Sequence, residues 1–165
     1  MTTTPDITFS DLQIGDAGWL IQRHGELYAE AEGFDATFEA LVASILVDFM
    51  RHRDPAVERA WIARRTGQRL GSIFCVKSDQ PDVAKLRLFL IDPKARGTGL
   101  GHRLLQMCID HVQACGFSKL RLWTHESHRA ACALYTKHGF RCTASRPVRS
   151  FGVDLVEQTW ELDLL

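Results

Sequence analysis

The sequence predicts an α/β (α+β) fold, in which a mixed central sheet of about seven strands is flanked by about four helices. Two observations support this. Along the 165 residues, hydrophobic patterns typical of strands and helices follow in the order strand, helix, helix, three strands, helix, strand, helix, two strands. One strand also leads through a glycine-rich turn directly into a helix, which is typical of a sheet with helical crossovers.

The N-terminal third is expected to hold one strand and two helices. Residues 1–6 are polar, and we expect a flexible tail there, followed by a single domain over 7–165. Residues 7–13 alternate well enough for a strand, and residues 18–31 are expected to be helical. A second helix is predicted by an apolar stripe with spacings of three and four residues: Phe38, Leu41, Val42, Ile45, Leu46 and Phe49.

The middle of the chain is expected to form a hairpin, a buried strand and a helix. Residues 60–63 and 70–76 are strand-like and are separated by a turn at Thr66-Gly67. A strand rich in leucine and phenylalanine follows over 84–91. The helix after the glycine-rich turn is predicted by a second apolar stripe, Leu100, Leu104, Met107, Cys108, His111 and Val112.

The C-terminal part is expected to add three strands and one short helix. A strand is predicted over 119–124, and a helix over 130–138 is stopped by Gly139. Residues 141–148 and 155–162 are expected to be the closing strands. No internal repeat or low-complexity linker divides the chain.

Composition excludes several classes of function. Twenty basic residues balance twenty acidic ones, so there is no excess positive charge to bind a nucleic acid. No apolar run approaches the roughly 18 residues that cross a bilayer, and the first residues do not resemble a signal peptide. We therefore expect a cytoplasmic protein that binds neither nucleic acid nor membrane.

The cysteines and histidines do not predict a metal centre. The five cysteines form no Cys-x-x-Cys pair, which argues against a zinc ribbon and against a disulfide framework. His125, His128 and Cys132 could share one helix face, but no fourth ligand accompanies them. We expect no metal.

The segment from Arg96 to Gly101 predicts an anion-binding turn. A strand, a glycine turn and a helix start in this order direct unpaired backbone N–H groups at one point. A P-loop would need a lysine after the glycines, and a dinucleotide fingerprint would need glycine where His102 stands. A glycine turn without a ligand stays the alternative on this segment alone.

Two runs of residues resemble the GNAT family of acyl-CoA N-acyltransferases. The segment Leu90–Gly101 looks like the family's coenzyme A motif, Arg/Gln-x-x-Gly-x-Gly/Ala, with its preceding strand. The segment His128–Phe140 is similar to the second motif, in which Leu-Tyr and Gly-Phe recur at fixed spacing. Further segments resemble the acetyltransferase half of bacterial proteins that join a MarR-type regulator to a GNAT domain. Since no winged-helix half accompanies them, we expect a freestanding enzyme.

The resemblance implies roles for the residues that match these motifs. Leu90 and Ile91 would lie on a strand that splays from its neighbour and pairs with the pantetheine arm of acetyl-CoA. Tyr135 would give a proton to the departing thiolate, although a core aromatic is the alternative interpretation. His128 stands where many members carry asparagine and would help to hold the coenzyme. The pyrophosphate would rest on the segment Arg96, Gly97, Thr98, Gly99, Leu100, Gly101 and His102.

The resemblance does not fix the general base or the acceptor. The candidates on or beside the first two helices are His24, Glu30, Glu32 and Glu39. We slightly favour Glu39, because part burial beside the apolar stripe would raise its pKa. Lys85 and Arg87 alternate with leucines and would suit an acceptor with a carboxylate or phosphate, if their face is the acceptor side.

The resemblance therefore implies an acetyl-CoA-dependent N-acetyltransferase that acts on a primary amine of a small molecule or peptide. We expect direct attack of the amine in a ternary complex. The alternative is a catalytically idle GNAT-fold module that binds acyl-CoA as a sensor or assembly surface. Because GNAT proteins often dimerise, a homodimer is possible.

Overall fold

The computed structural model describes residues 3–164 and confirms the expected mixed sheet of seven strands with four α-helices. The strands of this part of the chain are β1 (Thr8–Ser10), β2 (Arg59–Arg65), β3 (Gln68–Lys77), β4 (Val83–Ile91), β5 (Lys119–His125), β6 (Arg141–Ser150) and β7 (Val153–Asp163). The helices are α1 (Asp16–Glu32), α2 (Ala36–His52), α3 (Leu100–Ala114) and α4 (Arg129–Lys137), with a short 3-10 helix at Pro93–Ala95.

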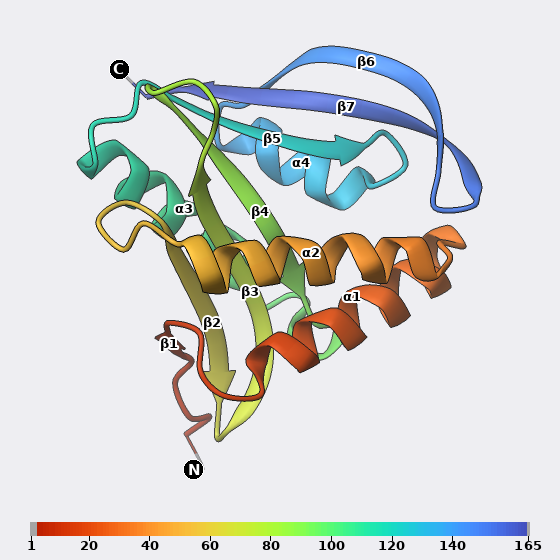
Figure 1. Cartoon of the computed structure of the whole chain (residues 1–165). Coiled ribbons are helices and arrows are strands. Elements are labelled where there is room, and N and C mark those ends of the chain that lie inside the picture. Colours follow the sequence, from red (N-terminus) through yellow and green to blue (C-terminus); the bar gives the residue numbers. More distant parts are fainter. Residues whose placement is uncertain (1–2, 165) are drawn as a thin grey trace.

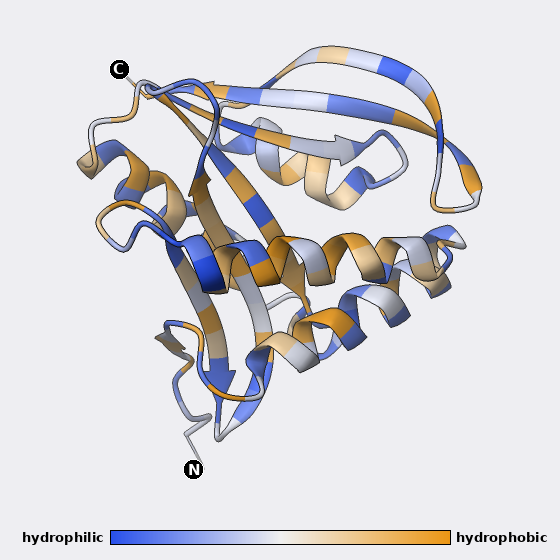
Figure 2. Ribbon diagram, in the orientation of Figure 1, coloured by the Kyte–Doolittle hydropathy of each residue, from blue (hydrophilic) through white to orange (hydrophobic). Residues whose placement is uncertain are grey.

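The sheet has the strand order β1-β2-β3-β4-β5-β7-β6. The pair β4–β5 is parallel, and the other neighbours are antiparallel. Helices α1 and α2 cross one face of the sheet, whereas α3 and α4 lie on the other (Figure 1). Strands β6 and β7 run together as a long ribbon beyond the end of β5, and the hydropathy colouring shows this ribbon as largely polar (Figure 2).

Each face of the sheet has its own hydrophobic core. One cluster joins α3 and α4 to the sheet through side chains such as Leu104, Leu105 and Tyr135. The other joins α1 and α2 to the opposite face through side chains such as Leu20 and Leu46. The apolar stripes predicted for α2 and α3 supply residues to these two cores, so the helical periodicity identified their buried faces.

The start of α1 differs from the prediction. The first strand was expected over residues 7–13 but ends at Ser10, and the helix begins at Asp16 rather than at residue 18. The reason is a turn closed by two hydrogen bonds: Gln13 N donates to Asp16 Oδ2 at 2.8 Å, and Asp16 N donates to Gln13 O at 3.0 Å. These bonds remove Gln13 from the strand.

Asp16 also fixes α1 to the β2–β3 hairpin. Its side chain is fully buried. Arg64 Nη1 and Arg69 Nε both donate to Asp16 Oδ1, at 2.8 Å and 2.7 Å. Burial alone would raise the pKa of this carboxyl, but the two arginines lower it overall. The pair of guanidinium groups therefore keeps a buried carboxylate charged.

We predict that Asp16→Ala lowers the free energy of unfolding by about 3–5 kcal/mol, because it leaves two partly buried guanidinium groups without their partner. Urea denaturation at neutral pH measures the effect. Asp154→Ala is the control, since it removes an exposed partner of Arg149 and should cost less than about 1 kcal/mol. Similar losses in both variants would contradict the structural role given to Asp16.

Candidate active site

A bulge in β4 shapes the centre of the site. Leu88 has a positive φ of 46°, and the register of β3 against β4 shifts at this point, so that Leu88 and Phe89 lie opposite the single residue Ile73. The hydroxyl of buried Ser72 donates to Leu88 O at 2.7 Å. This hydrogen bond stabilises a backbone conformation that costs roughly 1–2 kcal/mol in a residue with a branched side chain.

The bulge changes which face each side chain of β4 meets. Leu86 and Phe89 pack in the core beneath α3 and α4, whereas Leu88 packs in the core beneath α1 and α2. Regular alternation would place residues 86 and 88 on the same face. From Leu88 onward, the side chains of β4 therefore meet the opposite faces of the sheet from those that regular alternation would give.

Strands β4 and β5 separate after a short region of pairing. Their ladder joins only Val83–Lys85 to Lys119–Arg121. Beyond it lies a cavity of about 1370 Å³, lined by α1, α2, β4, the glycine turn, the end of β5, α4 and the β6–β7 turn. The gap between the two strands connects the α1–α2 side of this cavity with its α3–α4 side.

The glycine turn has the form of an anion cradle. Gly97 and Gly99 have φ values of 76° and 78°, and no heavy atom lies within 4 Å of the place where a Cβ would stand on either. Helix α3 starts directly after Gly99 without a side-chain cap and without an acidic residue in its first turn. Its first N–H groups are therefore available to a phosphate.

The residues expected to hold the coenzyme gather around this cavity, with one exception. Thr98 does not line it, because its hydroxyl donates to Ala95 O at 2.6 Å. The lining includes Leu90, Ile91, Arg96, Gly97, Gly99, Leu100, Gly101, His102, His128 and Tyr135.

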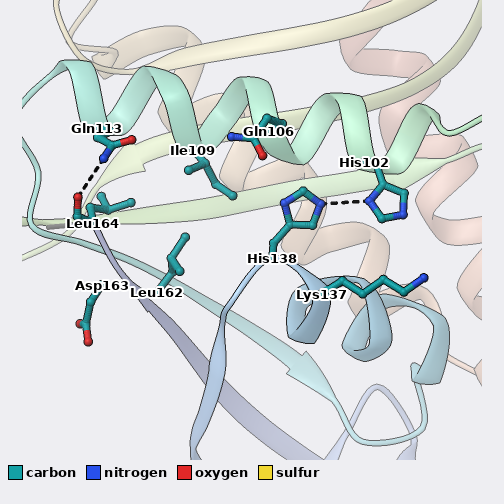
Figure 3. Close-up of a pocket in the computed structure, with 9 residues that line it drawn as sticks. All are labelled: His102, Gln106, Ile109, Gln113, Lys137, His138, Leu162, Asp163 and Leu164. Atoms are coloured by element: carbon teal, nitrogen blue, oxygen red, sulfur yellow. Dashed lines mark hydrogen bonds between the residues drawn. The ribbon is translucent and has the colours of Figure 1, made fainter.

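His102 borders a second hollow between α3, α4 and the end of β7, of about 680 Å³. Its Nδ1 lies 3.1 Å from Nε2 of His138. Figure 3 shows these two rings turned toward each other beside the hollow. Burial and the neighbouring His102 lower the pKa of His138. The imidazole of His102 is thus held against α4, beside the glycine turn.

Tyr135 is buried in α4 and also lines the cavity. Its ring packs against Phe140 at 5.6 Å and against Phe89 at 6.2 Å, between centroids. Burial raises the pKa of its phenol above the ordinary value, so the hydroxyl keeps its proton at neutral pH. The sequence left two interpretations of Tyr135, a core aromatic and a proton donor. The two are compatible, because Tyr135 is buried and also lines the cavity.

An ion pair links α1 to the start of the glycine turn. Arg23 Nε donates to Oδ2 of buried Asp92 at 3.1 Å. The other oxygen of Asp92 accepts from Lys94 N at 3.1 Å and caps the 3-10 helix that precedes the glycines. The sequence did not predict this link, because Arg23 and Asp92 lie far apart in the sequence.

Aromatic side chains line the α1–α2 half of the cavity. The rings of Tyr28 and Phe38 lie 4.7 Å apart, and those of Phe38 and Phe151 lie 5.1 Å apart, between centroids. Only Phe38 had a signal in the sequence, as part of the apolar stripe of α2. Tyr28 and Phe151 were not predicted, since their meeting depends on how the β6–β7 turn approaches α2, where Asp35 N donates to Phe151 O at 3.0 Å.

His24 is a buried, neutral imidazole at the wall of this half. Its Nδ1 lies 2.7 Å from Leu20 O, which makes Nδ1 the protonated nitrogen. The other nitrogen, Nε2, is buried and has no hydrogen-bond partner in the described residues. Burial lowers the pKa of His24 to about 4, so a free lone pair is present at neutral pH.

Two further histidines lie at the entrance to α4. Burial lowers the pKa values of His125 and His128, although the charge of Glu32 acts in the opposite direction. Nδ1 of His128 is 3.4 Å from the hydroxyl of Tyr28, and Glu32 accepts a hydrogen bond from the Ser127 hydroxyl at 2.8 Å. His128 therefore contacts Tyr28 in the α1–α2 half of the cavity, which we call the acceptor half, as well as the turn into α4.

The acidic candidates differ in whether they line the cavity. Glu30 and Glu32 line the cavity, but Glu39 does not. The expected part burial of Glu39 was wrong: its side chain is exposed and lies over Gly25 of α1. The helical period placed Glu39 beside the apolar stripe, but the close approach of α1 and α2 at Gly25 directs it away from the cavity.

The two basic candidates of β4 differ in the same respect. Arg87 lines the cavity, whereas Lys85 does not. Both cations lie over the ring of Trp123 on β5, with Lys85 Nζ at 5.6 Å and Arg87 Cζ at 5.8 Å from the centroid. Trp123, half-exposed at the mouth of the cavity, was not predicted as a site residue.

Residues 3–164 contain no cluster of three or more histidine, cysteine or acidic side chains arranged to bind a metal ion. Within the same residues, no helix is long and apolar enough to cross a membrane.

Comparisons with known proteins agree with this geometry. The sequence model of the Acetyltransferase (GNAT) family matches residues 21–140. An IAA acetyltransferase of Azospirillum brasilense is 32% identical over 95 residues, which are 58% of this chain and 61% of that protein. A mycothiol acetyltransferase of Nocardia farcinica is 37% identical over 62 residues, 38% of this chain and 20% of the relative. The chain thus spans less than two thirds of these curated relatives.

A solved structure shows the same fold with a ligand. The YncA protein of Salmonella typhimurium, described as an acetyltransferase and solved with its cofactor acetyl-CoA, superposes with a TM-score of 0.78. The match covers 97% of this chain and 95% of that chain at 17% identity. At this identity the likeness concerns the fold.

We predict that His24 makes the protein less stable as the pH falls from 6.5 toward 4. Its pKa is about 4 in the folded chain and about 6.5 in the unfolded chain. The unfolded state therefore takes up a proton first, and stability falls by up to about 1.4 kcal/mol per pH unit in this window, or about 2 kcal/mol between pH 7 and pH 5.

Urea denaturation at pH 7 and pH 5 measures this loss. His24→Gln should remove about 2 kcal/mol of the pH dependence, whereas His52→Gln, at an exposed position of α2, should leave it nearly unchanged. An unaltered pH dependence in His24→Gln would show that this imidazole titrates normally.

Proposed function

The chain belongs to the acetyltransferase (GNAT) family, and from this premise we propose that it transfers the acetyl group of acetyl-CoA to a primary amine of a small molecule or peptide. The amine attacks directly, in a ternary complex. One observation carries the proposal: the gap between β4 and β5 lies between an anion cradle on one side and an aromatic-lined pocket on the other. Two substrates can thus meet between the strands.

The coenzyme half supplies backbone groups. The N–H groups at the start of α3, next to Gly97 and Gly99, hold the pyrophosphate, and Arg96 adds a positive charge beside them. The edge of β4 at Leu90 and Ile91 has no pairing with β5, so its backbone groups are free to bind the pantetheine arm. Bound acetyl-CoA supplies an activated thioester at this point.

Tyr135 acts as the general acid. Its buried phenol is protonated at neutral pH, because burial raises its pKa, and it lines the same cavity as Leu90. The phenolic O–H donates a proton to the sulfur as the carbon–sulfur bond breaks. This keeps a thiolate from developing in an apolar environment, where charge is costly.

The acceptor amine must be neutral before it attacks. With a pKa of about 4, His24 is too weak a base to take a proton from an ammonium group, but its free Nε2 can accept a hydrogen bond and orient the amine. The proton leaves through Glu30 or Glu32, which line the cavity, or through water beside them. Glu39, outside the cavity, no longer has the support that favoured it.

Finer features of the protein stay predictions. The named relatives acetylate different compounds, and the chain spans only part of each, so neither identifies the acceptor. The resemblance to the acetyltransferase half of MarR–GNAT proteins, the cytoplasmic location and a homodimer are further proposals of this kind.

We predict that the chain binds acetyl-CoA at micromolar concentration and that Gly99→Ala weakens this binding about tenfold, since a Cβ occupies the space of the cradle and strains a left-handed residue. Isothermal titration measures both affinities. Gly67→Ala is a matched control: Gly67 has a φ of 77° and equally open surroundings but lies in the β2–β3 hairpin. Absence of acetyl-CoA binding in the wild type would refute the proposed function.

Tyr135→Phe should lower kcat at least about 100-fold, the usual contribution of a general acid, while the affinity for acetyl-CoA stays within a fewfold. Thiol release with an accepted amine measures the rate, and thermal denaturation confirms that the ring still packs. Unchanged turnover would remove the acid role from Tyr135. Binding of acetyl-CoA without turnover of any amine would instead favour a sensor or assembly module.

A further inference from the structure

Arg87 is a partly buried cation without an acidic partner. Its Nε is buried and has no hydrogen-bond partner within residues 3–164. Arg87 also takes part in none of the ion pairs formed by this part of the chain. Asp48 of α2 acts on it only from beyond ion-pair distance. A guanidinium in this situation has lost part of its hydration without gaining an anionic partner.

Several cations of the sheet are neutralised by ion pairs. On β5, Arg121 Nε donates to Glu161 Oε2 at 2.8 Å, and Lys119 Nζ lies 3.6 Å from Glu161 Oε1. At the other end of the sheet, Asp16 binds two arginines. Partly buried Arg65 and Lys85 also take part in no ion pair, but neither lines the cavity. Within residues 3–164, Arg87 is therefore the partly buried cation that lines the cavity without an ion pair, and it is open to an external anion.

The pairing of β4 with β3 places Arg87 in the acceptor half of the cavity. Arg87 lies opposite Phe74 of β3, and Phe74 belongs to the core beneath α1 and α2. The side chains that line the cavity around it include Leu41 and Ile45 of α2 and Trp123 of β5. Arg87 is therefore on the α1–α2 side, away from the glycine turn that would hold the pyrophosphate.

Trp123 supports the guanidinium without using its hydrogen-bonding capacity. Arg87 Cζ lies 5.8 Å from the centroid of the Trp123 ring, within the range of a cation–π contact. Such a contact stabilises the cation but accepts none of the N–H donors at the edge of the guanidinium. A forked pair of donors remains that matches the two oxygens of a carboxylate or phosphate.

We propose that Arg87, supported by Trp123, is an anion-binding subsite for the acceptor, so that the acceptor is an amine that also carries a carboxylate or phosphate group. This inference rests on the proposed function and specifies its substrate class. The anion of the acceptor supplies the missing partner of Arg87, and its amine extends toward the gap between β4 and β5. Lys85, whose Nζ lies 5.6 Å from the centroid of the Trp123 ring, adds positive charge nearby.

The experiment compares amines that differ only in charge at one end. Glycine, β-alanine and 4-aminobutyrate are each assayed against the corresponding carboxamide and aminoalkylphosphonate, with thiol release from acetyl-CoA as the readout. We expect the anionic form to exceed its carboxamide at least about tenfold in kcat/KM at the chain length that fits. In Arg87→Met the preference should fall to near unity, with the affinity for acetyl-CoA within about twofold.

Arg59→Met is the matched control. Arg59 also lies over a tryptophan, with its Cζ 5.4 Å from the Trp61 centroid, but it is outside the cavity. It should keep the wild-type preference for the anionic amine. Equal rates for acids, phosphonates and carboxamides in the wild type would overturn the inference, as would a preference that survives Arg87→Met. The ratio of carboxylate to phosphonate rates identifies which anion the subsite takes.

A second measurement does not depend on turnover. With coenzyme A present, malonate and phosphate are added separately as anion probes during thermal denaturation. They should raise the Tm of the wild type and of Arg59→Met more than that of Arg87→Met. In the absence of added anions, Arg87→Met should be as stable as the wild type or more stable, because it removes an unpaired partly buried charge. An equal anion-induced shift in all three proteins, or a marked loss of stability in Arg87→Met, would show that Arg87 is a structural residue.

The two proposals fail differently. Absence of acetyl-CoA binding removes the proposed function, whereas acetyl-CoA binding together with indifference to the charge of the amine removes only the anion subsite.

Discussion

The hydrogen bond from Ser72 to the carbonyl of Leu88 holds the distortion on which the site depends. Because Leu88 has a left-handed conformation, β4 carries one extra residue against β3 and its later side chains change faces. Past Lys85, the strand stays attached to β3 but no longer pairs with β5. A sheet that paired fully here would have neither an open backbone edge nor a passage between its two faces.

The core of the cavity keeps its titratable groups uncharged. Burial lowers the pKa values of His24, His125 and His128 and raises that of Tyr135, so each of these groups is neutral near pH 7. Acidic and basic side chains line the cavity at a few places: Arg96 at the cradle, Arg87 beside Trp123, and Glu30 and Glu32 at the end of α1. A substrate with separated charges would find its partners at the edges of an otherwise neutral interior.

The sequence predicted the order of the elements and most of the residues that gather around the glycine turn. These depend on local patterns: the apolar stripes of α2 and α3, the hairpin, and a glycine turn whose ligating groups belong to the backbone. The acceptor half was predicted less well, because its residues meet only through tertiary contacts. Tyr28 and Phe151 are brought together by the approach of the β6–β7 turn to α2, and no spacing in the sequence indicates this.

Two predicted site residues lie outside the cavity for the same physical reason. Glu39 and Lys85 were chosen from regular periodicity, which predicts a face but not what covers it. Glu39 lies over Gly25 of α1 at an exposed position. Lys85 shares the strand face of Arg87 and the ring of Trp123 but lies outside the cavity. Irregular backbone, which is where the site lies, is the part of a fold that periodicity describes least well.

The ion pair between Arg23 and Asp92 connects α1 to the segment that leads into the glycine turn. Asp92 determines how the chain enters the 3-10 helix before the glycines, and Arg23 lies one residue before His24 in the acceptor wall. Any displacement of α1 that accompanies acceptor binding is therefore transmitted to the geometry of the cradle. Thermodynamic linkage makes such coupling reciprocal: a change in cradle affinity that the acceptor causes through this contact is matched, by the same factor, by a change in acceptor affinity when the cradle is filled.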